Sequence, residues 1–142
     1  MEVLGGRGCN TEVMNRIVAP ADIAAPSANY AHAIVSEGTR KWLHTSGVVP
    51  TRPDGTVPAS IEAQAEVVWA NLLAILREAG MGARDVVSVT TYVVVEQMAQ
   101  LSKVMAARDA ALDGHRASST LVTVPALVRP EWKMEIALIA AR

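Results

Sequence analysis

Glu135 is the residue of this sequence whose type and surroundings most directly suggest chemistry. It lies in the apolar segment WKMEIALIAA, residues 132–141. In an extended segment, alternation places Glu135 on one face with Ala137 and Ile139. A carboxylate there must find a cationic partner or act as a stronger base, as general bases and water-positioning groups do. An ion pair with Lys133, or with a cation on a neighbouring strand, is the alternative, and both hypotheses stay open. The opposite face of the segment is expected to hold Trp132, Met134, Ile136 and Leu138.

Other polar side chains carry weaker signals. Ser46 in HTSGVVP precedes a glycine, but the flanking pattern of a nucleophile elbow is absent. The pattern therefore favours a serine that satisfies turn backbone. Tyr30 in SANYAHAI is typical of a packed strand-edge ring with a solvated hydroxyl. Arg116 and Arg129 fall in turn and loop segments, where solvated side chains are the better expectation.

Composition excludes several classes of protein. The three histidines fit no zinc-binding spacing, and a single cysteine rules out an internal disulfide. No phosphate loop, nucleotide fingerprint or metal-ligand cluster is present in the sequence. The net charge of −1, with no Lys/Arg run longer than two residues, argues against a nucleic-acid partner. No apolar run reaches the roughly 18 residues of a membrane span, and the N-terminus lacks the apolar region of a signal peptide. These features predict a soluble, cytoplasmic protein.

The elements that position Glu135 follow from periodicity and turn residues. Residues 1–13 are glycine-rich and are expected to form a flexible extension, followed by a single domain over 14–142. Ser60 is a candidate cap for a helix that stops near Gly80. The two segments around the Glu37–Gly38 turn are expected to form a hairpin. The expected strands cover 31–36, 41–46, 85–95, 119–124 and 132–141, and the expected helices cover 60–81 and 97–114.

This order, β-β-α-β-α-β-β, predicts an α+β fold with two helices on one face of a sheet. Two helices are too few to cover both faces. The other face, expected to be apolar, should therefore be covered by another subunit.

Taken together, several segments resemble the RidA/YjgF family of enamine/imine deaminases, also labelled endoribonuclease L-PSP. The segments are PSANYAHAI, HTSGVVP, IEAQAEVVWANLLAILREAG, VVSVTTYV and STLVTVPALVRPEWKMEIALIA, within residues 16–142. The resemblance implies a chorismate-mutase-like fold and a homotrimer with small-molecule clefts between subunits. It also implies hydrolysis of enamines and imines to a keto acid and ammonia without a metal or organic cofactor.

The resemblance assigns site residues position by position. Glu135 falls on the glutamate that positions the attacking water, and Tyr30 and Ser46 fall on cleft residues. The arginine that holds the substrate carboxylate does not carry over, because Ser119 stands at its position. Two further departures are Met98, near a cleft asparagine, and Leu121, at a position where some members carry cysteine. Arg116 precedes Ser119 by three residues and is not the same residue displaced.

Two functions remain open from the sequence. One is a divergent branch that hydrolyses enamine- or imine-type metabolites with a non-standard substrate preference, since a serine cannot replace a two-pronged guanidinium. The other is a non-catalytic module of the same fold that binds a metabolite or acts as a regulator. RNA cleavage, a label some members carry, is disfavoured because the sequence has no basic stretch.

Overall fold

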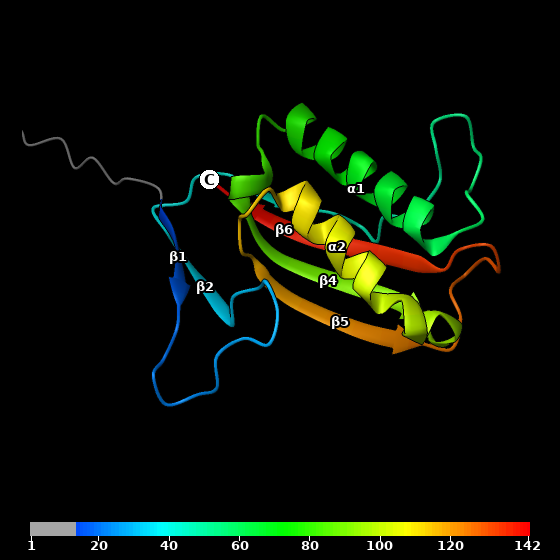
Figure 1. Ribbon diagram of the computed structural model, residues 1–142. Coiled ribbons are helices and arrows are strands. Elements are labelled where there is room, and N and C mark those ends of the chain that lie inside the picture. Colours follow the sequence, from blue (N-terminus) through cyan, green and yellow to red (C-terminus); the bar gives the residue numbers. More distant parts are fainter. Residues whose placement is uncertain (1–13) are drawn as a thin grey trace, which may run out of the picture.

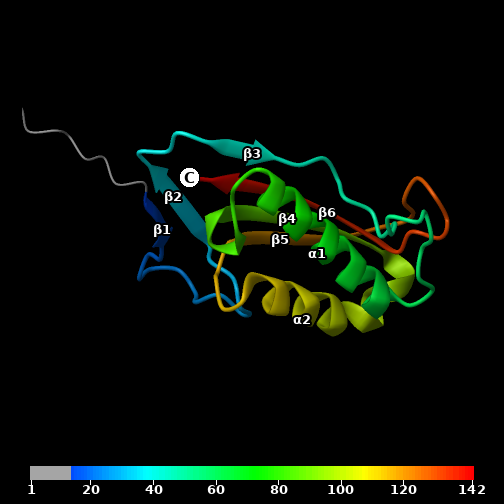
Figure 2. The same cartoon turned by 90° about the horizontal axis from the view of Figure 1, so that it is seen from above.

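The computed structural model describes residues 14–142 and shows a sheet covered on one face by two helices (Figure 1 and Figure 2). The predicted extension, residues 1–13, lies outside the described residues. The main sheet has the order β3-β6-β4-β5, and β1 and β2 form a separate two-stranded sheet. The strands are β1 (Met14–Val18), β2 (Ala33–Glu37), β3 (Trp42–His44), β4 (Val86–Val94), β5 (Ser118–Val124) and β6 (Met134–Ala141). The helices are α1 (Ile61–Glu78) and α2 (Leu101–Leu112), with short 3-10 helices η1 (Ala83–Asp85) and η2 (Val95–Gln100).

The capping residues predicted for α1 are confirmed. The Ser60 hydroxyl accepts a hydrogen bond from the backbone N–H of Ala63, and Gly80 follows the helix with a φ of +70°. The stripe that α1 turns toward the sheet contains Val68, Leu72 and Leu76, all with no exposed surface. Each such side chain contributes on the order of 1.5–3 kcal/mol by leaving water. This packing fixes α1 over β6.

The strand β6 alternates as the sequence predicts, whereas β4, expected to be a buried strand, also alternates between buried and half-buried positions. Met134, Ile136 and Leu138 are buried beneath the helices. Glu135, Ala137 and Ile139, on the other face of the strand, are only half-buried. β4 runs antiparallel to β6 and parallel to β5, with α2 as the crossover between the two parallel strands. From β2 onward the chain therefore follows the predicted β-β-α-β-α-β-β order.

The predicted hairpin between residues 31–36 and 41–46 is wrong. Gly38 does take a positive φ of 68°, but β2 pairs with β1, a strand the sequence pattern did not predict. β3 instead pairs with β6, and the N–H groups of Arg40 and Lys41 both donate to the carbonyl of Arg142. The residues after Gly38 thus form backbone hydrogen bonds with the C-terminal strand β6 and do not pair with β2.

The face of the main sheet away from the helices differs from the apolar surface expected. Strand register brings Ser88, Thr90 and Tyr92 of β4 beside Ser118 and Thr120 of β5. These positions are partly or fully exposed in the subunit. The uncovered face therefore carries hydroxyl groups together with the apolar side chains of Val122, Ala137 and Ile139, and Glu135 of β6 lies on the same face.

No helix within residues 14–142 is long and apolar enough to cross a membrane.

Candidate functional site

A bulge in the chain that follows β3 shapes the surroundings of Glu135. The backbone N–H of Thr45 donates to the carbonyl of Leu138, and Val48 exchanges two backbone hydrogen bonds with Ile136. Two residues of the bulged segment, Ser46 and Gly47, therefore lie opposite a single residue of β6, Ala137. The Thr45 hydroxyl accepts from the N–H of Leu138 and completes the ladder. Such bulges redirect side chains and backbone and are common beside active sites.

The carboxylate of Glu135 lies directly against the backbone of Gly47. A Cβ placed on Gly47 would lie 1.7 Å from Oε1 and 2.6 Å from Cδ of Glu135. Only a residue without a side chain fits this approach, which explains the glycine physically. Ser46 is exposed in the same bulge and directly precedes Gly47. Of the residues assigned to the cleft by resemblance, Ser46 is therefore a chain neighbour of the backbone that Glu135 contacts.

The predicted alternative, an ion pair between Glu135 and a cation, is absent within residues 14–142. Lys133 instead donates its ammonium to the carbonyl of Ala59. Across the sheet, the partner of Glu135 in the strand register is Tyr92, which shares its face. The half-buried carboxylate thus faces hydroxyl-bearing side chains and solvent rather than a fixed positive charge.

Gln64 of α1 fixes the start of the strand that carries Glu135. Its side chain is fully buried, and its amide nitrogen donates to the carbonyls of Pro58 and Glu131, both at 2.8 Å. Its amide oxygen accepts from the N–H of Lys133, also at 2.8 Å. The amide therefore joins the beginning of α1 to the beginning of β6, two residues before Glu135.

Ser119 lies on the covered face of the sheet, not beside Glu135. Its register partner on β4 is the buried Val89, and its hydroxyl accepts a hydrogen bond of 3.3 Å from Nη1 of Arg108 on α2. Arg108 is 7% exposed and also donates from both Nε and Nη2 to a single oxygen, Oδ1 of Asp109. Leu121, two residues further along β5, packs against the hydrophobic core.

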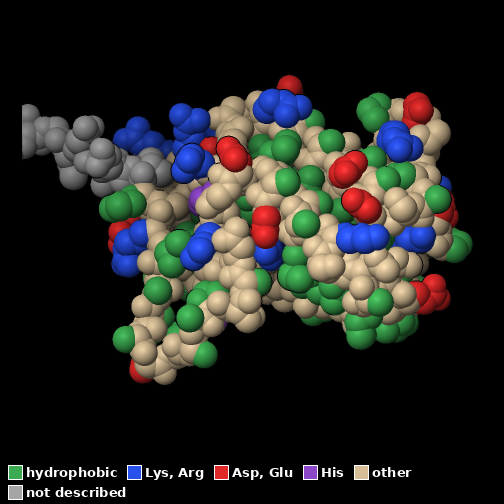
Figure 3. Space-filling model, in the orientation of Figure 1, with side chains coloured by type: hydrophobic (Ala, Val, Ile, Leu, Met, Phe, Trp, Pro, Cys, Tyr) green, Lys and Arg blue, Asp and Glu red, His purple; other side chains and the backbone are tan. Residues whose placement is uncertain are grey.

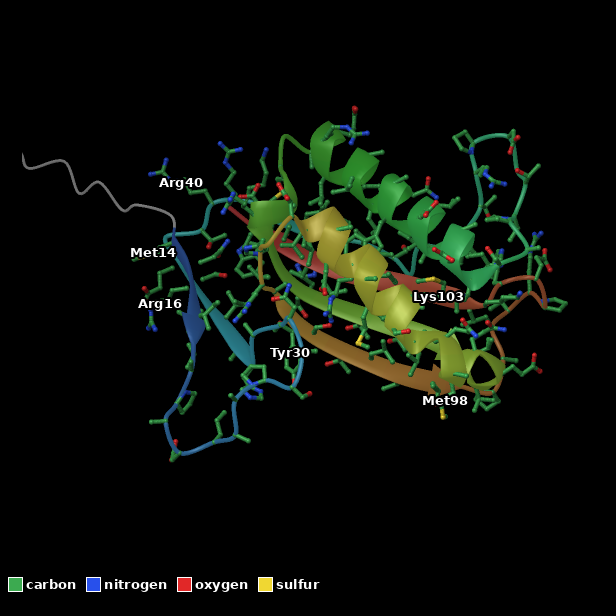
Figure 4. The ribbon with its side chains drawn as sticks, in the orientation of Figure 1. Met14, Arg16, Tyr30, Arg40, Met98 and Lys103 are labelled. Atoms are coloured by element: carbon green, nitrogen blue, oxygen red, sulfur yellow. The ribbon has the colours of Figure 1, made fainter. Side chains whose placement is uncertain are left out.

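Tyr30 and Met98 lie in different parts of the subunit (Figure 4). Tyr30 sits at the start of β5, where the N–H of Ala31 donates to the carbonyl of Ala117. Its ring meets that of His32 edge-on at 5.7 Å. Met98, 53% exposed, belongs to η2 at the opposite end of β5. One subunit does not bring both side chains to Glu135.

Sequence reasoning missed three residues that shape this site: Gly47, Tyr92 and Gln64. Gly47 carried a signal, because a glycine directly after a strand-end serine is compatible with a close backbone approach. The strand alternation of VVSVTTYVV could have placed Tyr92 on the uncovered face. Gln64 gave no signal beyond being a polar residue within the apolar stripe of a helix.

Within residues 14–142, no group of three or more His, Cys, Asp or Glu side chains is arranged to hold a metal ion. The pKa of one carboxyl elsewhere in the chain is lowered: Asp54, in the turn before α1, accepts hydrogen bonds from the hydroxyl and the backbone N–H of Thr56.

Comparisons with known proteins agree with this architecture. Residues 21–142 match the family model described as Endoribonuclease L-PSP. The crystal structure of YyfB from Yersinia pestis, a protein of unknown function of the conserved Rid family, has 32% sequence identity and a TM-score of 0.82. That alignment covers 90% of this chain and 98% of YyfB. No curated protein matches the chain.

Two further crystal structures have a similar fold. TdcF from E. coli, with bound serine, is 25% identical with a TM-score of 0.64, over 89% of this chain and 98% of TdcF. A protein of unknown function from Pseudomonas aeruginosa is 28% identical with a TM-score of 0.62, over 91% of this chain and 93% of that one. These likenesses confirm the predicted α+β, chorismate-mutase-like fold.

Proposed function

Because the chain belongs to the endoribonuclease L-PSP family, to which the Rid proteins are assigned, we propose that it hydrolyses enamine- or imine-type metabolites in a cleft built around Glu135. The observation that carries this proposal is the contact of the Glu135 carboxylate with Gly47. Within residues 14–142 this carboxylate has no ion-pair partner, and it lies beside the bulge on a face that carries several hydroxyl groups.

The chemistry assigned to Glu135 is general-base catalysis. Its carboxylate takes a proton from a water molecule while the oxygen of that water forms a bond to the imine carbon. The C=N electron pair moves to nitrogen, which is protonated to give a carbinolamine. Loss of ammonia as the C–N bond breaks then yields the carbonyl product. An enamine substrate first gains a proton at carbon and becomes the imine. A positioned general base accelerates such a step by typically 10²–10⁴-fold.

The substrate preference follows from the charge around Glu135. The family resemblance places an arginine at the position of Ser119. Ser119 faces α2, and its hydroxyl accepts a hydrogen bond from Arg108. No guanidinium is thereby supplied from this position to the uncovered face. We therefore assign the cleft to imines without a carboxylate, or to carboxylates bound through hydroxyl and backbone N–H groups.

A complete cleft needs a second subunit in this proposal. Tyr30 and Met98 lie at opposite ends of β5, whereas Ser46 lies in the bulge that faces β6, next to the glycine that Glu135 contacts. A homotrimer in which subunits contact one another through their uncovered faces would supply Tyr30 or Met98 from a neighbour. It would also cover the exposed side chains of that face.

A second candidate is a non-catalytic metabolite-binding module. It is favoured by the similarity to TdcF, whose crystal structure holds bound serine. In this function the bulge would bind a small polar ligand without activating water.

The two candidates are separated by measuring ammonia release above the buffer background. Three imine classes generated in solution would be compared: neutral, monocarboxylate and aromatic. We expect hydrolysis of the neutral imine to exceed that of the monocarboxylate. Binding of these compounds or of serine without any acceleration would support the binding module instead. Cleavage of a structureless RNA under the same conditions, with no effect on imines, would overturn both.

A further inference from the structure

A small cavity separate from Glu135 lies between the β1–β2 sheet and the turn that leads into β5. Its volume is about 260 Å³. Asn15 and Ile17 line it from β1, and Ile34, the register partner of Ile17, lines it from β2. The amide of Asn15 donates to the carbonyl of Ala141 at 2.8 Å, which anchors this wall to the end of β6. None of the residues assigned to the Glu135 cleft lines this cavity.

The opposite wall is cationic. It is formed by Arg84 of η1 and by His115 and Arg116 of the turn before β5. Within residues 14–142, neither arginine belongs to an ion pair. The nearest acidic residue in the chain to Arg84, Asp85, is engaged by the backbone N–H of Gly82 at 2.8 Å. Figure 3 shows several Lys and Arg side chains at the end of the molecule that carries β1 and β2, and others at the opposite end.

Other contacts hold this wall in place while leaving donors free. The Nε of Arg116 donates to Oδ1 of Asn29 at 2.9 Å, and its two terminal nitrogens donate to no other group within residues 14–142. Nε2 of His115 lies 2.7 Å from the carbonyl of Val86 and donates to it. Both side chains are thus positioned before any ligand arrives. Such pre-positioning lowers the entropy lost on binding.

We infer that this cavity binds a small aliphatic carboxylate. Two guanidinium groups match the planar, two-oxygen geometry of a carboxylate. The facing isoleucines, Ile17 and Ile34, favour a short apolar chain. A volume of about 260 Å³ lies below the roughly 300–1,000 Å³ of ordinary ligand pockets, so the ligand has few carbon atoms and is not a nucleotide.

Titration of the full-length protein with isovalerate, followed by backbone amide NMR shifts, tests the site directly. We expect the signals of residues 15–17, 84 and 114–116 to move. Isovaleramide, which lacks the charge, and acetate, which lacks the apolar chain, should each bind more weakly than isovalerate. Inorganic phosphate binding more tightly than isovalerate would overturn the assignment to an aliphatic carboxylate. Shifts confined to Gly47 and Glu135 would place the ligand in the other cleft and overturn the site.

Substitutions provide the second measurement. Arg84 makes no side-chain hydrogen bond within residues 14–142, so Arg84→Gln removes charge with little effect on folding. It should raise the dissociation constant of isovalerate about tenfold or more, as loss of one charge-assisted contact does. Arg116→Gln should act in the same direction. The control is Arg77→Gln, an exposed arginine of α1 that does not line the cavity. Equal affinity in Arg84→Gln, Arg77→Gln and the unaltered protein would refute the proposal.

Discussion

The backbone of Gly47 and the carboxylate of Glu135 occupy adjoining space, with 1.7 Å between Oε1 and the position a Cβ would take on Gly47. Gly47→Ala must therefore displace the carboxylate. The displaced atoms are the far end of a flexible side chain, so we expect the free energy of unfolding to change by no more than about 1 kcal/mol. Activity should fall at least tenfold, since misplaced catalytic groups lose much of their effect.

The matched control is Gly82→Ala. Apart from its two chain neighbours, no residue of the described part of the chain comes within 4 Å of the Cβ that this substitution adds, and Gly82 has a φ of −140°. Measured together, denaturant unfolding and imine hydrolysis should show Gly82→Ala unchanged in both. Full activity in Gly47→Ala would mean that the position of the Glu135 carboxylate does not matter for the reaction.

Gln64 provides a test of how β6 is held. Gln64→Leu removes three hydrogen bonds and leaves the carbonyls of Pro58 and Glu131 and the N–H of Lys133 without their partner. We expect a loss of roughly 2 kcal/mol or more in unfolding free energy, because each orphaned buried group costs about 1–3 kcal/mol. The control, Gln97→Leu, changes a side chain with no hydrogen bond within residues 14–142. An equal effect of the two substitutions on urea unfolding would show that the three hydrogen bonds of the Gln64 amide do not contribute to the free energy of unfolding.

Ser119 is expected to act through stability. Ser119→Ala removes the hydroxyl that accepts from the buried guanidinium of Arg108. The expected loss is about 1–2 kcal/mol in unfolding free energy, measured by thermal and chemical denaturation. Ser102→Ala, at an exposed position of α2, should have little effect. A large change in substrate preference with unchanged stability would place Ser119 in the ligand site instead.

Assembly can be tested through complementation between subunits. Light scattering should give three times the subunit mass of 15.0 kDa. If one subunit supplies Tyr30 and another supplies Glu135, then Tyr30→Ala and Glu135→Gln are each inactive as homotrimers. Unfolding and refolding them together should restore part of the activity, because some clefts then receive both native residues. If mixtures of the two variants exchange subunits and remain inactive, the cleft is not shared between subunits. A monomeric mass at micromolar concentration would also contradict a shared cleft.

Local patterns predicted the parts of the fold that depend on one segment alone. Alternation in WKMEIALIAA placed Glu135 on the less buried face, and Ser60 marked the start of α1. Pairing between distant segments was harder to predict. The chain after Gly38 could equally pair with β2 or with the C-terminal strand, and only the complete sheet shows that β3 joins β6.

The same limit applies to the candidate site. The segment STLVTV carries similar residues on both faces, so its sequence does not reveal that Ser119 faces α2. The deciding partner, Arg108, lies on a different element. The bulge at Ser46 and Gly47 likewise depends on the hydrogen bonds of Thr45 and Val48 with β6.

The central claim is that Glu135 acts as the general base for imine hydrolysis. The most direct measurement compares kcat/KM for a neutral imine, above the buffer background, between the unaltered protein and Glu135→Gln. We expect a fall of about 10²–10⁴-fold with an unchanged melting temperature. Glu131→Gln, an exposed carboxylate near Arg129, is the control and should retain full activity. Equal kcat/KM in Glu135→Gln and the unaltered protein would contradict the account.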